Sequence, residues 1–279
     1  MSQPRSVFAK WMKKSAIIGA ILVSMPTPSY ASGDLLVAPT RVILDSRRGA
    51  EVILSNIGNE ESTYRISLEL RRMTDVGKLE DIDKALATDE ESQALSLVRY
   101  APRRVTLLPN QPQSIRIKPI IPVDLEDGEY RAHMSFRAIP KTESATEVES
   151  GNAGLQIRLV PIYGITIPII VRKGKLEATA AIANPRIVTD KAGSSFQLDL
   201  SRKGDRSVYG EVHVTKPGVK KPLMVAKGIA IYPEIEERLV RIPITPEMIT
   251  ALSGEVVVSY YEPATSGGGL ISQTRTVIQ

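Results

Sequence analysis

The chain has 279 residues, a length that suggests two domains of ordinary size. Hydrophobic residues make up 42% of it, which is enough for packed cores and argues against a disordered or collagen-like chain. The sequence contains no cysteine, so neither disulfides nor thiolate metal sites can form.

Residues 1–31 have the pattern of a secretory signal peptide. Four basic residues precede a short apolar stretch, and Ser29 and Ala31 supply the small side chains that predict cleavage after Ala31. The apolar stretch is too short for a membrane span. This leader holds four of the 36 basic residues and none of the 31 acidic ones, so the rest of the chain is close to neutral. The formal charge of +5 is therefore poor support for nucleic-acid binding.

Short segments with alternating apolar side chains begin at residue 35. Residues 35–44, 50–56 and 62–70 each alternate with a period of two and are separated by polar turns. The pattern resumes at 103–122 and again at 129–139. Strands at this spacing, without long helical segments between them, predict a β-sandwich rather than βαβ units.

Residues 73–96 break this pattern. The segment is acidic and lacks a period of two, which predicts a solvated loop with a short helix across 81–87. Its carboxylates lack the alternating spacing and the central glycine of a calcium-binding loop, so no metal site is predicted there.

The segment 155–172 carries the strongest strand signal. Its odd-numbered positions are apolar throughout, and they include the residues Leu155, Ile157, Leu159, Pro161 and Tyr163. Most strands stop at about 5–6 residues, so this apolar edge is longer than one domain needs. Two interpretations stay open. The segment is either an edge strand that pairs with another chain, or one long strand, bulged at Gly164, that is buried in its own domain.

The segment 173–175 reads Lys-Gly-Lys and marks the predicted domain boundary. It divides an N-terminal domain of residues 32–173 from a C-terminal domain of residues 174–279. Strand and turn alternation continues through the second domain, which predicts another β-sandwich. The predicted fold class is all-β.

Catalytic motifs are missing from the sequence. The two histidines, His133 and His213, lie in strand-like alternation and are interpreted as packed or surface residues. No nucleophile elbow, zinc-binding helix motif or phosphate-binding glycine loop occurs. No enzyme, no catalytic residue, no metal site and no cofactor is predicted.

With the strands placed, the chain resembles the periplasmic pilus-chaperone family (PapD-like), as a divergent branch. Four segments carry the resemblance by their order and spacing: APTRVILD (38–45), RRVTLLPNQPQSIRI (103–117), the DGEYR to FRAIP stretch (127–140) and LQI to PIIVR (155–172). It implies two immunoglobulin-like β-sandwich domains in an L-shape with a cleft between them. It also implies location in the periplasm.

The resemblance implies donor-strand complementation as the function. A chaperone of this kind stabilises a pilus or fimbrial subunit by lending it a strand, then delivers it to an outer-membrane usher. By position, the lent side chains are Leu155, Ile157, Leu159, Pro161 and Tyr163. The implied partners are these subunits and the usher, with no nucleic acid and no small-molecule cofactor.

Two cleft bases of the family hold the terminal carboxylate of the subunit. Arg41 resembles the first of them. The second, a lysine in the family, falls at Pro168 or Gly164, neither of which is basic. The residues that could substitute for it are Arg131, Arg137 and Arg158.

The resemblance further implies a buried salt-bridge set between the two domains. Arg172 and Glu129 match two of its members, and Glu262 lies near the position of the third. This set would hold the angle between the domains rather than perform chemistry.

Two other classes of function compete with this interpretation. One is a pilus structural subunit or adhesin, which would polymerise by itself. The other is a secreted β-sandwich protein that binds or hydrolyses carbohydrate.

Overall fold

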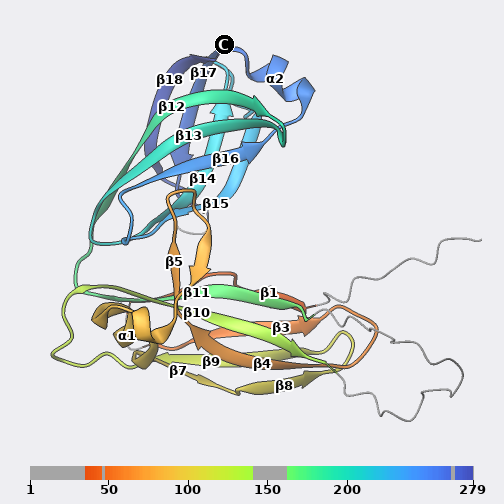
Figure 1. Cartoon of the computed structure of the whole chain (residues 1–279), viewed down its shortest axis with the longest axis vertical. Helices are drawn as coiled ribbons and strands as arrows, with labels where there is room; N and C mark the ends of the chain where they lie inside the picture. The colour runs from red at the N-terminus through yellow and green to blue at the C-terminus, as the bar shows by residue number, and fades with distance from the viewer. Residues whose placement is uncertain (1–34, 46–47, 141–161, 265–267, 279) are drawn as a thin grey trace, which may run out of the picture. The chain divides into compact units, whose positions relative to one another are not determined.

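The computed structural model describes residues 35–45, 48–140, 162–264 and 268–278. Strands dominate these residues, and they form two β-sandwiches that follow one another along the chain (Figure 1). The all-β, two-sandwich prediction is therefore confirmed. The predicted signal peptide lies outside the described residues.

The first sandwich consists of two sheets that enclose one core. The strands of its four-stranded sheet are, in spatial order, β1 (Leu35–Ala38), β3 (Ala50–Asn56), β9 (Pro112–Pro119) and β7 (Val98–Ala101). The strands of its five-stranded sheet are β2 (Val42–Leu44), β11 (Gly164–Lys173), β10 (Gly128–Ile139), β4 (Ser62–Glu69) and β8 (Arg104–Leu107).

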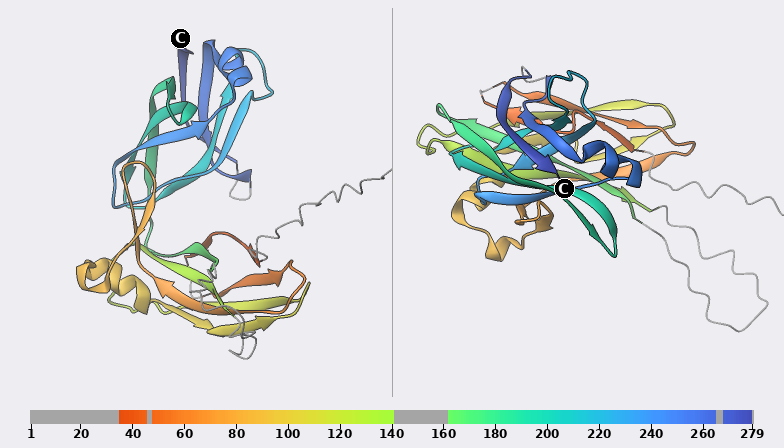
Figure 2. Two further views of the ribbon diagram at one scale, coloured as in Figure 1. Left: turned by 45° about the vertical axis from the view of Figure 1, so that its right-hand side comes forward. Right: turned by 90° about the horizontal axis from the view of Figure 1, so that it is seen from above.

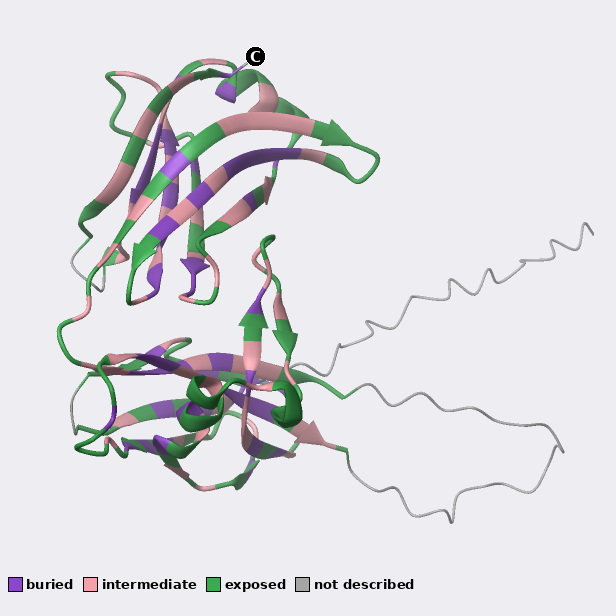
Figure 3. Cartoon of the chain, turned by 60° about the vertical axis from the view of Figure 1, so that its left-hand side comes forward, coloured by how far each residue is buried: buried purple, intermediate pink, exposed green. Residues whose placement is uncertain are grey.

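Alternation along the strands produces this core, as the bands of buried and exposed residues in Figure 3 show. In β3, Val52 and Leu54 are fully buried, whereas Ile53 between them is 47% exposed. Successive side chains of a strand point to opposite faces, so one row enters the core and the other faces outward.

The stretch 35–44, predicted as one strand, is divided between the two sheets. β1 pairs with β3 in the four-stranded sheet, whereas β2 pairs with β11 in the five-stranded sheet. Pro39, which lacks a backbone N–H, stands at the start of the crossover and cannot continue the ladder. The crossover leaves Arg41 between the two strands, at the entrance to β2.

β11 forms a regular ladder. It pairs antiparallel with β10 from Gly164 to Lys173 without a register shift, so the bulge that was considered at Gly164 is not there. On its other side β11 pairs in parallel with β2, but only over Ile169–Val171. Its odd-numbered apolar row, from Ile165 to Val171, packs in the core of the first sandwich.

The segment 73–96, predicted as a solvated loop, is mostly ordered structure. β5 (Arg71–Met73) and β6 (Leu79–Asp81) form a hairpin, followed by a 3₁₀ turn η1 (Lys84–Leu86) and helix α1 (Asp89–Ser96). The helix lies eight residues later than predicted, because Thr88 and Glu91 form a capping box that fixes its start.

The second sandwich contains a three-stranded and a four-stranded sheet that face each other (Figure 2). The three-stranded sheet consists of β12 (Ala178–Asp190), β13 (Gly193–Gly204) and β16 (Glu237–Pro243). The four-stranded sheet consists of β15 (Met224–Ile231), β14 (Val208–Thr215), β17 (Gly254–Tyr261) and β18 (Leu270–Ile278). Helix α2 (Pro246–Leu252) precedes β17 and buries Leu252.

A short connection joins the sandwiches. β11 ends at Lys173 and β12 begins at Ala178. Gly174 has a φ of +82°, and a Cβ at this position would overlap the side chain of Asp127. The turn therefore requires glycine for its backbone conformation and for its close packing.

Candidate functional site

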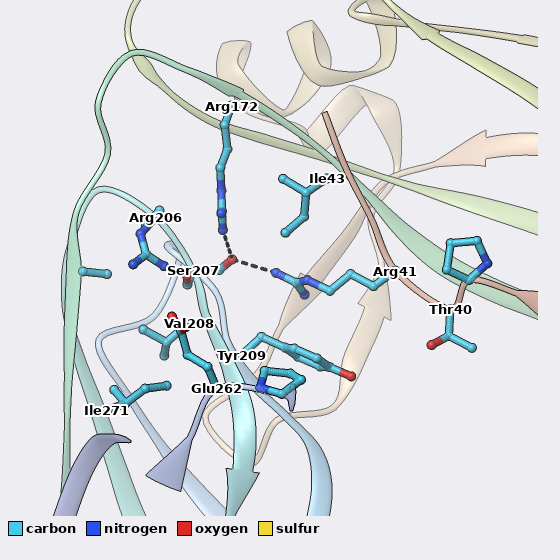
Figure 4. A pocket seen from close by; sticks show the side chains of 13 residues that line it. Thr40, Arg41, Ile43, Arg172, Arg206, Ser207, Val208, Tyr209, Glu262 and Ile271 are labelled. Atoms are coloured by element: carbon cyan, nitrogen blue, oxygen red, sulfur yellow. Dashed lines mark hydrogen bonds between the residues drawn. The ribbon is translucent and has the colours of Figure 1, made fainter. Parts of the chain in front are cut away.

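A pocket of about 570 Å³ is lined by residues of both sandwiches (Figure 4). The first sandwich contributes the crossover from Pro39 to Ile43 and the end of β11 at Arg172. The second contributes the segment 206–209 at the start of β14, with Glu262 and Ile271 near β17 and β18. The pocket therefore combines three guanidinium groups with apolar walls.

Arg41 enters this pocket from the crossover between β1 and β2. Its Nη2 donates to Ser207 Oγ at 3.0 Å and its Nη1 donates to the Tyr232 hydroxyl at 3.2 Å. The guanidinium carbon also lies 4.7 Å from the centroid of the Tyr209 ring, within the range of a cation–π interaction. These contacts hold the charge in the pocket without neutralising it.

Arg172 and Glu129 form a buried ion pair beside Arg41. Arg172 Nη2 lies 2.8 Å from Glu129 Oε2, and the Glu129 side chain is completely buried. The same oxygen accepts hydrogen bonds from the backbone N–H and the hydroxyl of Ser207, at 3.1 and 3.0 Å. A residue of the second sandwich therefore completes the coordination of a carboxylate that belongs to the first.

The hydroxyl of Ser207 connects the two arginines, as the dashed lines in Figure 4 show. It accepts from Arg41 and from Arg172, and it donates to Glu129. The position of Arg41 is in this way tied to the buried ion pair.

Arg41 and Arg206 have no carboxylate within ion-pair distance among the residues that the structure describes. Glu262 is the acidic residue that lines the pocket, and Arg172 is neutralised by Glu129. Two cationic groups thus remain available, and the planar guanidinium of arginine suits a bidentate contact with a carboxylate. The chemistry of the pocket fits a carboxylate flanked by apolar groups.

The interdomain set differs from the prediction at its third member. Arg172 and Glu129 are paired, but no ion pair joins Glu262 to either of them within the described part of the chain. Ser207 takes the third place instead. A serine gives no sequence signal for an ion-pair set, so only its position in the fold identifies it.

Of the three arginines that were considered for the second base, the two that the structure describes do not line the pocket. Arg131 is paired with Glu234, Arg137 is exposed in β10, and Arg158 lies outside the described residues. Arg206, which sequence reasoning did not single out, lines the pocket from the second sandwich. It donates to the backbone oxygen of Ser207 at 3.3 Å.

The predicted donor residues Leu155, Ile157, Leu159 and Pro161 lie outside the described residues. Tyr163 is described and is 41% exposed. The predicted donor range of 155–172 is too long, because the row from Ile165 to Val171 is used by the core of its own sandwich.

One edge of β11 is open beside the pocket. Among the described residues, no strand pairs with that side of β11 before Ile169, where β2 begins to pair. Ile162 and Tyr163, just before β11, are 56% and 41% exposed. An extended chain could therefore add to the sheet in line with β2.

His133 lies on the outer face of β10 and is 1% exposed. Neither ring nitrogen has a hydrogen-bond partner among the described residues. Burial lowers the pKa of His133 to about 3, with further lowering by the charges of Arg131, Arg71 and Arg41. The ring is neutral at ordinary pH and is a packed residue, as its strand-like alternation suggested.

Among the described residues, no group of three or more His, Asp and Glu side chains is arranged to hold a metal ion. No helix in this part of the chain has the length and the apolar character needed to cross a membrane.

Comparisons with known proteins show similarity in fold at low sequence identity. No protein-family model matches the chain. No curated protein matches it. Solved structures that it resembles include the E. coli chaperone DraB, with 13% identity over 88% of this chain and 96% of that one, at a TM-score of 0.46.

Two further structures give similar values. The class 5 fimbriae chaperone CfaA has 12% identity over 88% of this chain and 99% of that one, at a TM-score of 0.43. A Salmonella enterica structure of the SafA pilin with the SafB chaperone has 16% identity over 87% and 95%, also at 0.43. Because these TM-scores lie below 0.5, function has to be inferred from the residues of the chain itself.

The Glu129→Ala substitution should destabilise the protein by about 3–5 kcal/mol, because it leaves the Arg172 guanidinium without its counter-charge in a buried setting. Urea unfolding measures the change in the free energy of unfolding. The matched control is Glu177→Ala, which removes the exposed partner of Lys175 and should leave stability unchanged within error. Equal losses in the two variants would contradict a stabilising role of the buried pair.

The protein should lose stability as the pH falls from about 6.5 towards 3. In this window the unfolded chain binds a proton at His133 that the folded chain excludes, so the free energy of unfolding falls by up to about 1.4 kcal/mol per pH unit. Urea unfolding at pH 7, 5 and 4 measures the slope. His133→Gln should reduce it, whereas His213→Gln serves as the control. An unchanged slope in His133→Gln would show that burial does not lower the pKa of this ring.

Proposed function

We propose that this protein is a periplasmic chaperone that binds pilus or fimbrial subunits by donor-strand complementation and delivers them to an outer-membrane usher. It acts by binding, without catalysis and without a cofactor. The observation that carries the proposal is the location of Arg41 at the end of the open edge of β11.

The direction of β2 explains why this location matters. β2 runs parallel to β11, and its first residue Val42 lies opposite Ile169. A guest strand that runs parallel to β11 along 162–168 would be in line with β2 and would end where β2 begins. Its terminal carboxylate would then meet Arg41, with Arg206 as a second cation in the same pocket. An extended chain with a free carboxyl end is the ligand that fits both features.

The alternation of β11 supports the donation of a strand. The row from Ile165 to Val171 faces the core of the first sandwich. A continued period of two would place Leu155, Ile157, Leu159 and Pro161 on the same side of the chain, beyond that core. These side chains would be buried by an incomplete sandwich, with a gain of about 25 cal/mol per Å² of apolar surface.

The proposed location rests on the signal-peptide pattern of residues 1–31, which predicts export. The usher as the next partner rests on the resemblance of the sequence alone. Self-polymerisation of the purified protein would favour a pilus structural subunit or adhesin instead. Sugar binding by the isolated protein would favour a carbohydrate-binding sandwich.

The double substitution Ile157→Glu and Leu159→Glu should abolish capture of a pilus subunit that lacks its last strand, because charged side chains cannot enter its apolar groove. Co-purification from a strain that expresses both proteins measures capture. The matched control places the same charges at Leu36 and Ile53, which are each 47% exposed on the other sheet. Capture that survives the first double substitution would exclude strand donation by this segment.

Arg41→Ala should weaken binding of a peptide that corresponds to the C-terminal segment of the incomplete subunit, which ends in the free carboxylate. The loss should appear only when the peptide has a free carboxylate, and a C-terminally amidated peptide should bind both proteins equally weakly. Fluorescence anisotropy measures the dissociation constants. The control is Arg116→Ala, whose side chain is 84% exposed on the four-stranded sheet. An equal loss of affinity for both peptides would show that Arg41 does not bind the terminal carboxylate.

A further inference from the structure

The β5–β6 hairpin, which is labelled at β5 in Figure 1, is exposed or half-buried along most of its length, as the composition suggested, but one of its side chains is buried. Met73 is 5% exposed and packs in a separate cluster with Ile170, Ala230 and Tyr232. Ile170 belongs to β11, whereas Ala230 and Tyr232 belong to the second sandwich. A side chain of the hairpin thus completes an apolar contact between the two sandwiches.

Backbone hydrogen bonds tie the hairpin to the second sandwich at two points. The Met73 N–H donates to Glu234 Oε1 at 2.8 Å. The Asp75 carbonyl accepts from the Leu239 N–H of β16 at 2.7 Å. In both bonds a backbone group of the hairpin is paired with a residue of the second sandwich.

Glu234 is the centre of the charged part of this contact. Arg131 of β10 donates to it through both terminal nitrogens, at 2.5 and 3.0 Å. Arg131 also donates to the Arg71 carbonyl at 3.0 Å, and its guanidinium carbon lies 3.7 Å from the centroid of the Tyr232 ring. The exposed fractions of the Arg131 and Glu234 side chains are only 9% and 19%, so solvent screens this pair weakly.

Tyr232 connects this contact to the pocket. Its ring packs with Met73 and lies under Arg131, and its hydroxyl accepts the hydrogen bond from Arg41. A shift of the second sandwich that displaced Tyr232 would therefore also displace a partner of Arg41.

We propose that the β5–β6 hairpin is an interdomain clamp, with Met73 and Glu234 as positioning residues that keep the two sandwiches in one arrangement and hold Tyr232 against Arg41. The consequence for carboxylate binding rests on the proposed function. The clamp itself does not, because it concerns only contacts within this chain.

The clamp is tested by pulsed electron paramagnetic resonance, which measures the distribution of distances between two spin labels. The chain has no cysteine, so labels at Gln111→Cys and Lys191→Cys, one exposed position in each sandwich, report on the arrangement alone. The doubly labelled protein with an otherwise unchanged sequence should give one narrow distribution of label-to-label distances. Glu234→Gln and Met73→Ala should each broaden it at least twofold.

The matched control is Asp199→Asn, which makes the same carboxylate-to-amide change in the partner of Arg186 within the second sandwich. This variant should keep the narrow distribution. Circular dichroism establishes that each variant is folded, and Met73→Ala serves as the test if Glu234→Gln does not fold. A narrow distribution in a folded Glu234→Gln or Met73→Ala variant would overturn the clamp.

Binding of the carboxylate peptide to the same variants separates the two proposals. A broadened distribution with at least fivefold weaker peptide binding supports the clamp and its effect on the pocket. A broadened distribution in the variants, with no peptide binding even by the parent protein, would leave the clamp standing and overturn the proposed function of the pocket.

Discussion

The carboxylate of Glu129 is the group on which the arrangement of the pocket depends. It belongs to β10 and is fully buried. One of its oxygens accepts the hydrogen bonds of both Arg172 and Ser207. A buried charge is tolerated only when it is paired and hydrogen-bonded. Arg172 of the first sandwich supplies the counter-charge, and Ser207 of the second sandwich adds two further hydrogen bonds to the same oxygen. The same serine then fixes Arg41.

β11 connects this ion pair to the proposed binding edge. One row of its side chains, including Ile167 and Ile169, fills the core of the first sandwich. The opposite row contributes Ile170 to the cluster with Met73 and Arg172 to the ion pair. Side chains on both faces of the second half of the strand are therefore held by contacts within the chain, and the edge before Ile169 is the part that can accept another chain. A rigid edge is an advantage for strand pairing, because less conformational entropy is lost on binding.

The two contacts between the sandwiches differ in their chemistry. The Glu129 set is polar and lies at the pocket, whereas the hairpin contact combines an apolar cluster with the Arg131–Glu234 pair. Tyr232 participates in both through its ring and its hydroxyl. Polar sets specify one geometry but contribute little net stability, and apolar burial contributes stability with little directional preference. Together they provide an arrangement that is both stable and defined.

Periodicity is a property of neighbouring residues, so the alternation in the sequence was enough to predict the all-β class and a strand within 155–172. The candidates Arg41, Glu129 and Arg172 came from the resemblance of short segments to the pilus-chaperone family. The crossover at Pro39, the hairpin at 71–81, and the places of Ser207, Arg206 and Glu234 became visible only in the folded chain. Ser207 and Glu234 act on partners more than 70 positions away, as Ser207 does on Glu129. No local pattern marks such a pairing, since it depends on how residues of two sandwiches come together around a buried charge.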